Sequence, residues 1–514
     1  MFLIRFFGMI IGFFRRIGQR NQNERQLNNI EVQNERLRNV STYRSAPIEA
    51  FVVRNRRGNI LVSGNNQSIK NRVSCVAAYN SCLRRKPVVI LHCGNSELER
   101  LISEAYSTEY MHYIINRNNP IYDPFLGLSK EEISQLVVTA SSGSNRVERI
   151  GGIGGTYING LTDYLLANGR TPVASSYIRC PHDELLSRVL RHQENGEISD
   201  ADARHITDEI TQGKSEQGKV EQCFRVLNTQ ASCILSRSAD WAISIRKAID
   251  ENETISIDLV SASNDLLISM VLQEIRDAMS MGKKFLLVLD SIPIDASESL
   301  GQLIRNYSSS CNFVYASSDA YSDTQSTANV FETLLAKSNT VFVMQHNSAN
   351  TNKKFSEYFG EYQRVEINTT YASGDTYATY GQILPGSSNS NITSTQRVNK
   401  PRVEERDIAS LSYDELYIKC DSNQEIIHVR STDGVATGRY EQPRRLHAQS
   451  SRIRTRRINW LVFFLLFFAF PPAAFIYSLV VCGRTGKIVS AIFLVLTVAL
   501  IITYFVLLHV NGII

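Results

Sequence analysis

Two short stretches of the sequence carry residue types that could bind and cleave a phosphate anhydride. The first follows the apolar run GNILVSG at 58–64 and consists of Gly64, Asn65, Asn66, Gln67, Ser68, Ile69, Lys70 and Asn71. It can be compared with the phosphate loop G-x-x-x-x-G-K-[ST]. In that loop backbone N–H groups surround the phosphates, the Lys bridges two of them and the hydroxyl binds Mg²⁺. Gly64 and Lys70 are kept, so the segment predicts a degenerate nucleotide site.

Two positions of this segment depart from the loop pattern. Ile69 replaces the second glycine, and a β-branched side chain resists positive φ and would put bulk where the phosphate sits. Asn71 replaces the hydroxyl residue and is a poor ligand for magnesium. An ordinary strand-to-helix turn is the alternative interpretation.

The second stretch is FLLVLD at 285–290, an apolar run that ends in a carboxylate. Asp290 could hold Mg²⁺ at the end of a strand, although apolar strands that end in Asp are common. Ser291 follows where hydrolysis would need a base to polarise water, and a serine alone is not one. Binding of ATP and Mg²⁺ is therefore expected to be weak or absent.

The elements around these stretches predict an α/β fold. Six short runs are apolar throughout rather than alternating, which indicates strands buried on both faces of a parallel, doubly wound sheet. These runs lie at 58–64, 87–94, 254–260, 285–291, 312–318 and 340–345. Ligands of such sheets bind at the carboxyl ends of the strands. We therefore expect Lys70 and Asp290 to face each other at this edge, on adjacent strands.

The order of these elements resembles the type IV secretion coupling proteins, the TraG/TraD-like conjugative ATPases of the FtsK–HerA group. The similar pieces are GNILVSGNNQSIKN, PVVILHCGN, the residues Tyr122, Asp123, Pro124 and Phe125, TISIDLV, FLLVLDS, Ser317 with Ser318, TVFVMQHNSANTNKKFSEYFG and KPRVEERDIASLSYDELYI. They cover about residues 50–420. The resemblance implies a RecA-like P-loop NTPase fold with a helical insertion, in an oligomer of like or unlike subunits. It also implies other secretion subunits and a DNA or DNA–protein substrate as partners.

The predicted organisation has six parts. They are a membrane-interface segment and polar linker at 1–45, the first part of the α/β domain at 46–180, a helical insertion at 181–250, the second part of the α/β domain at 251–420, a basic linker at 421–457 and a transmembrane hairpin at 458–512. The glycine-rich GGIGGTYING at 151–160 does not fit G-x-G-x-x-G and is predicted as a flexible loop.

Hydropathy and charge point to a membrane-tethered chain. Of 514 residues 43% are hydrophobic and 20% charged, and the mean hydropathy of −0.16 excludes a protein made mostly of membrane spans. Runs at 460–481 and 488–510 are each long enough to cross a bilayer. Seven Arg against one Glu at 439–457 favour a cytoplasmic α/β domain at a bacterial plasma membrane.

The sequence allows two interpretations of the first hydrophobic run and of the apolar start, and it contains no known metal motif. Pro471 and Pro472 would also suit a re-entrant first segment. The apolar start at 1–14 is too short to span and should lie in the interface, with a signal peptide as the alternative. The nine scattered cysteines show no C-x-x-C and the nine histidines no H-E-x-x-H, so no known metal motif is present.

Together these patterns predict a docking platform for DNA or protein substrate that is a pseudo-ATPase. One alternative is an active ATPase motor of DNA transfer that uses Lys70 and Asp290 in spite of its divergent loop. The other is a membrane scaffold with no role in transfer.

Overall fold

The computed structural model describes ten stretches of the chain. These are residues 27–54, 58–106, 111–144, 146–259, 265–292, 297–307, 311–324, 329–375, 387–420 and 425–432. The chain divides into two units. The larger comprises Asn39–Tyr362 and Pro401–Arg445, and the smaller comprises Met1–Arg38, Gln363–Lys400 and Leu446–Ile514.

A ten-stranded sheet forms the centre of the larger unit, in the order β1-β12-β11-β8-β2-β7-β6-β3-β5-β4. Its strands are β1 Val40–Ala46, β2 Asn59–Ser63, β3 Val88–His92, β4 His112–Ile115, β5 Thr254–Asp258, β6 Leu286–Asp290, β7 Asn312–Ser317, β8 Ser338–Val343, β11 Glu415–Cys420 and β12 Glu425–Ser431. From β8 to β4 neighbouring strands are parallel, whereas β11 is antiparallel to both β8 and β12. The predicted mixed α/β fold with a large parallel sheet is confirmed, and each of the six predicted runs overlaps a strand.

Helices cover both faces of this sheet, which is why its strands are apolar throughout. The helices are α2 Glu49–Arg54, α3 Gln67–Cys82, α4 Ser96–Tyr106, α12 Asp265–Ser280, α13 Ser297–Tyr307, α14 Ala320–Thr324, α15 Val330–Lys337, α16 Ala349–Phe359 and α17 Glu405–Ala409. Alternate residues of a strand point to opposite faces. Ile60 and Val62 of β2 pack with α2, α3 and α4, while Leu61 between them packs with the cluster that includes α12, α13, α15 and α16.

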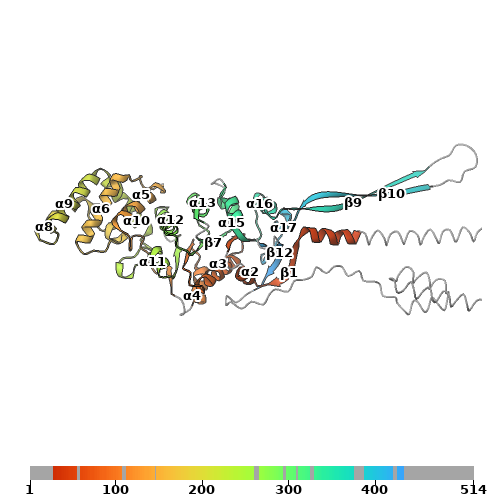
Figure 1. Ribbon diagram of the computed structural model, residues 1–514, viewed down its shortest axis with the longest axis horizontal. Helices are drawn as coiled ribbons and strands as arrows, with labels where there is room; N and C mark the ends of the chain where they lie inside the picture. The colour runs from red at the N-terminus through yellow and green to blue at the C-terminus, as the bar shows by residue number, and fades with distance from the viewer. Residues whose placement is uncertain are drawn as a thin grey trace, which may run out of the picture. The chain divides into compact units, whose positions relative to one another are not determined.

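The sequence between β4 and β5 forms a block of helices, which gathers at one end of this unit (Figure 1). It contains α5 Lys130–Ser142, α6 Gly152–Ala167, α7 Ala174–Ile178, α8 Leu185–Glu194, α9 Asp200–Gly213, α10 Gln217–Ala231 and α11 Ile245–Asp250, with short 3₁₀ turns at His182–Glu184, Lys214–Glu216 and Ala239–Trp241. The segment predicted as a helical insertion, 181–250, is the second half of this block.

The prediction of a flexible loop at 151–160 is wrong, because these residues begin α6. The backbone N–H groups of Gly151 and Gly154 both donate to Oε2 of Glu216 at 2.8 Å, so a carboxylate satisfies the start of the helix. A Cβ at Gly160 would lie 3.0 Å from Ile210 of α9. The glycines therefore allow close helix packing, which offsets their low helix propensity.

In the smaller unit residues 27–38 are helical, and β9 Glu361–Asp375 pairs with β10 Ser387–Pro401 in a two-stranded sheet. Asn34 of the helix exchanges two hydrogen bonds with the backbone of Val365, at 2.9 and 3.0 Å.

None of the helices in the described part of the chain combines the length and apolarity that a bilayer crossing requires. The predicted spans at 460–481 and 488–510, the apolar start at 1–14 and the basic cluster at 439–457 lie outside the described residues.

Candidate functional site

The turn from β2 into α3 is short and is held by backbone hydrogen bonds. The N–H of Gly64 donates to the carbonyl of Ser317 at 3.1 Å, and that of Asn65 to Gln345 at 3.3 Å. Gly64 has φ 136°, and a Cβ there would lie 2.5 Å from Cβ of Met344. Glycine is therefore required by the backbone packing of this turn, whether or not a phosphate binds.

Helix α3 starts with a side-chain cap. Asn66 is the N-cap residue, and its Oδ1 accepts the backbone N–H of Ile69 at 3.0 Å while its Nδ2 donates to the carbonyl of Tyr413 at 2.6 Å. Gln67 is already helical, and Asn65 and Ser68 are exposed. In an intact phosphate loop the backbone N–H of position 69 would face a phosphate. Here it donates to the side chain of the N-cap residue instead.

Ile69 does not occupy the phosphate position, contrary to the expectation from its place in the motif. Its side chain is buried in the core between the sheet and α2–α4. The reason is that the helix begins at Gln67, and this start rotates position 69 onto the inward face of α3.

Lys70 is almost fully buried, with 1% of its surface exposed. Its ammonium donates to Oγ of Ser318, just beyond β7, at 2.9 Å. Burial lowers the pKa of Lys70, and the carboxylates of Asp290 and Asp323 oppose this shift. Lys70 is therefore directed to the carboxyl edge of the sheet, where Asp290 also lies.

The expectation that Lys70 and Asp290 lie at adjacent strands is wrong. Strand β7 stands between β2 and β6 in the sheet. Both residues still belong to the same edge because these three strands are parallel. Ser318, which follows β7, consequently occupies the space between them.

Side-chain amides surround the carboxylate of Asp290. Nδ2 of Asn95 donates to Oδ2 of Asp290 at 2.5 Å, and Nε2 of Gln67 lies 3.4 Å from the same oxygen. Asn71 accepts from Gln67 at 2.8 Å and from Asn95 at 2.7 Å through its Oδ1. The predicted residues Gln67, Asn71 and Asp290 thus form one network, together with Asn95.

Sequence reasoning missed Asn95, which follows β3 after Cys93 and Gly94. The available signal was its place just past the carboxyl end of a buried strand, the same position that singled out Asp290. Ser291 has φ 55° and its hydroxyl lies 3.4 Å from Oδ1 of Asp290. It is a neutral group beside the carboxylate, as its residue type implied.

A second set of polar groups, also missed from the sequence, follows β7 and β8. Asp323 accepts a short hydrogen bond from Ser317, and Asp319 accepts from Oγ1 of Thr351 at 2.9 Å. His346 stacks on Phe355 with ring centroids 5.4 Å apart, and burial lowers its pKa to about 4. Its imidazole is therefore neutral at physiological pH and adds no positive charge for a phosphate.

These residues do not fit ATP with Mg²⁺. Magnesium requires near-octahedral oxygen ligands, but Oδ2 of Asp290 is contacted by amide N–H donors and position 71 offers an amide instead of a hydroxyl. The capped start of α3 also consumes a backbone donor. What remains suited to an anion is Lys70.

No protein-family model matches the sequence, and no curated protein matches it. Solved structures do match. The conjugative coupling protein TrwB lacking its first 70 residues, in its unbound form, is 15% identical with a TM-score of 0.45, over 74% of this chain and 86% of that one. TrwB with a non-hydrolysable ATP analogue gives 15% and 0.46, over 74% and 88%. VirB4 of Thermoanaerobacter pseudethanolicus gives 10% and 0.41, over 74% and 91%. The structures that this chain is similar to thus include a conjugative coupling protein, the kind of protein that its sequence resembles.

Proposed function

We propose that the protein is a membrane-anchored, coupling-protein-like component of a conjugative or type IV secretion system. It serves as a cytosolic docking platform for DNA or protein substrate and does not hydrolyse ATP on its own. The membrane anchor and the orientation rest on the apolar runs and arginines near the carboxyl terminus of the sequence. The secretion role rests on the ordered motifs between residues 50 and 420.

The amide network around Asp290 is the observation that supports the pseudo-ATPase part of this proposal. Asn95 is 2.5 Å from the carboxylate oxygen that Mg²⁺ would need. An ion bound at Oδ2 would require this bond and the Gln67 contact to break, and Asn71 would then offer it a poor ligand. Loss of the base at Ser291 removes the means to activate water as well.

An active ATPase is the second candidate, and one observation favours it. Lys70 is buried at the carboxyl edge under the influence of two carboxylates, Asp290 and Asp323. A buried lysine with a perturbed pKa at such an edge is a candidate for a functional site. If the protein is an active ATPase, nucleotide binding would have to break the hydrogen bond from Asn95 to Asp290.

Nucleotide turnover separates the two candidates. The full-length chain and its Lys70→Ala variant should hydrolyse ATP at the same background rate, measured by phosphate release with and without Mg²⁺. A Lys70-dependent rate tenfold or more above that background would contradict the proposal and establish the motor.

Restoring the missing groups tests whether the site is a decayed nucleotide site. The combination Asn71→Ser, Asn95→Ala and Ser291→Glu returns a hydroxyl ligand, removes the competing amide and supplies a base, while leaving Ile69 in the core. We expect MgADP affinity, measured by calorimetry, to rise at least tenfold. Adding Asp290→Asn should cancel the gain, because the carboxylate is the common ligand. No gain would mean that the turn after β2 only starts a helix.

Complementation separates the platform from both alternatives. In a host that carries the native transfer system, deletion of this protein should reduce transfer, and the Lys70→Ala variant should restore it. A variant that fails to restore transfer although it is produced normally would favour the motor. A deletion without effect on transfer would favour the scaffold.

A further inference from the structure

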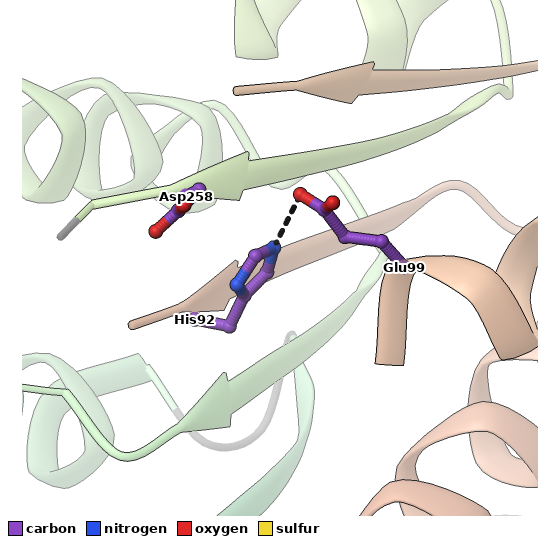
Figure 2. Close-up of side chains that lie close together, drawn as sticks. All are labelled: His92, Glu99 and Asp258. Atoms are coloured by element: carbon purple, nitrogen blue, oxygen red, sulfur yellow. Dashed lines mark ion pairs between the residues drawn. The ribbon is translucent and has the colours of Figure 1, made fainter. Parts of the chain in front are cut away.

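A second cluster of polar side chains lies at the same edge of the sheet, beyond Asp290. His92 ends β3 and is in register with Asp258 at the end of β5. Residues in register on parallel strands point to the same face. Figure 2 shows the imidazole of His92 between the carboxylate of Asp258 and that of Glu99, which comes from α4.

Two buried atoms of this cluster, Nε2 of His92 and Oε1 of Glu99, make no hydrogen bond among the described residues. His92 is fully buried. The two atoms nevertheless lie 3.4 Å apart. This ion pair is long, so it satisfies each atom only in part, and a metal ion bound by both atoms would replace it with two stronger contacts.

The spacing of the three side chains suits a metal ion. One ligand atom each from His92, Glu99 and Asp258 lie within 4.8 Å of one another. Two ligands placed about 2.1 Å from a tetrahedral zinc ion are about 3.4 Å apart, which is the separation of Nε2 and Oε1. A small movement of the Asp258 carboxylate would complete the set.

We propose that His92, Glu99 and Asp258 form a binding site for a divalent transition-metal ion, with Zn²⁺ as the preferred occupant. One imidazole nitrogen and two carboxylate oxygens suit zinc, whereas Mg²⁺ and Ca²⁺ prefer oxygen ligands throughout. Three protein ligands leave a fourth position for water or a ligand oxygen. Asp290 lies in register with His92 on the neighbouring strand β6, but Oδ2 of its carboxylate accepts from the amide of Asn95, so Asp290 is not among the proposed ligands.

Neighbouring groups hold two of the three ligands in place. Oε2 of Glu99 accepts from Nδ2 of Asn116 at 2.9 Å, and Oδ1 of Asp258 accepts the N–H of Gly94 at 2.9 Å. Hydrogen bonds of this kind orient ligating carboxylates. One contact opposes the ion, because the N–H of Asn95 points at Nδ1 of His92, which carries the ring proton when Nε2 binds metal. At 3.3 Å this contact is long and its loss costs little.

The chain contains a matched cluster that should not bind metal. Asp163, His205 and Glu209 are also close enough to share an ion. However, the ammonium of Lys130 lies among them, 2.7 Å from Asp163 and 3.5 Å from Glu209. The lysine already neutralises these carboxylates and repels a cation.

Zinc titration of the metal-free, full-length chain tests the proposal. Calorimetry should show a site in the wild type whose affinity falls at least tenfold in His92→Ala and in Glu99→Gln. His205→Ala should bind as the wild type does. Equal affinity of wild type and both cluster variants would overturn the proposal, as would a loss of binding only in His205→Ala.

Two further measurements distinguish zinc binding at the His92 cluster from a folding defect of the variants and from binding at Asp290. Zn²⁺ should raise the thermal midpoint of the wild type and of Asp290→Asn, but not that of Glu99→Gln, whose side chain keeps the shape of glutamate. Excess Mg²⁺ should not displace the zinc. Loss of zinc binding in Asp290→Asn while Glu99→Gln still bound it would place the ion at Asp290 and refute the assignment.

Discussion

Two asparagine side chains form hydrogen bonds with the polar groups at the carboxyl edge of the sheet. Asn66 satisfies the start of α3, and Asn95 donates to Asp290. An amide can satisfy part of a carboxylate's demand for donors without adding charge, so Asn95 stabilises the buried Asp290 in addition to the electrostatic attraction of Lys70. Lys70 is held in the same way by the neutral hydroxyl of Ser318. The polar groups at this edge of the sheet thus satisfy one another through hydrogen bonds.

Replacement of Ile69 tests whether this residue serves the core. Ile69→Gly should lower the free energy of unfolding by roughly 3–5 kcal/mol, because it leaves a cavity and adds a glycine to a helix. Ile69→Val should cost only about 0.5–1.5 kcal/mol. Denaturant unfolding of the variants measures both. A loss below about 1 kcal/mol for Ile69→Gly would contradict the burial of this side chain in the core.

At the scale of elements, the helical block is attached to the sheet through buried carboxyl groups. Asp123, before α5, accepts the backbone N–H groups of Phe125 and Ala174 at 2.9 and 2.8 Å. Glu274 of α12 accepts the hydroxyl of Tyr122 at 2.7 Å and the N–H of Arg246 at 2.9 Å. Burial raises the pKa of each carboxyl group to about 7.

This junction predicts that stability depends on pH. Between about pH 4.5 and 7 the carboxyl group of Glu274 is protonated in the folded state, whereas the unfolded state has already released this proton. The free energy of unfolding should therefore fall as pH rises through this window, and level off above it. Glu274 contributes roughly 3 kcal/mol to the change. Denaturation at pH 5 and pH 8 should show a smaller difference in Glu274→Gln, and an unchanged one in the exposed Glu148→Gln. Equal pH dependence in all three proteins would refute the prediction.

The contact between α6 and α9 makes a second prediction at this scale. A Cβ at Gly213 would lie 2.5 Å from the backbone nitrogen of Tyr157, which cannot move away easily. Gly213→Ala should therefore destabilise the protein by about 1–3 kcal/mol. Gly218 in α10 has nothing within 4 Å of such a Cβ, so Gly218→Ala should stabilise by up to about 1 kcal/mol. Thermal unfolding of the pair provides the measurement, and equal effects would argue against close packing at Gly213.

For the whole molecule, the parallel sheet collects its polar chemistry along one edge. Ser63, Ser317, Asp290, His92 and Asp258 end five neighbouring strands in that order. Parallel strands present their carboxyl ends together, so residues far apart in sequence become neighbours. Two sites of different chemistry, the amide-bound Asp290 and the His92 cluster, can therefore exist side by side.

The orientation of the chain in a membrane is also a prediction at this scale. Arginines before residue 460 should keep the larger unit in the cytoplasm and place Cys482, between the two predicted spans, on the other side. A membrane-impermeant thiol reagent should label Cys482 in intact cells but reach Arg430→Cys only after the cells are opened. Labelling of position 430 in intact cells would reverse the orientation.

The sequence by itself determined the features that depend on neighbouring residues. Continuous apolar runs predicted six buried strands, and the residue types at 71 and 291 show an amide and a hydroxyl at these positions. These follow from local hydrophobic pattern and side-chain chemistry.

The tertiary structure decided what depends on distant partners. Three features depend on how the strands are ordered: the insertion of β7 between β2 and β6, the approach of Asn95 to Asp290, and the cluster of His92, Glu99 and Asp258. Strand order is set by crossovers and packing over the whole sheet, so no local pattern of residues could reveal it.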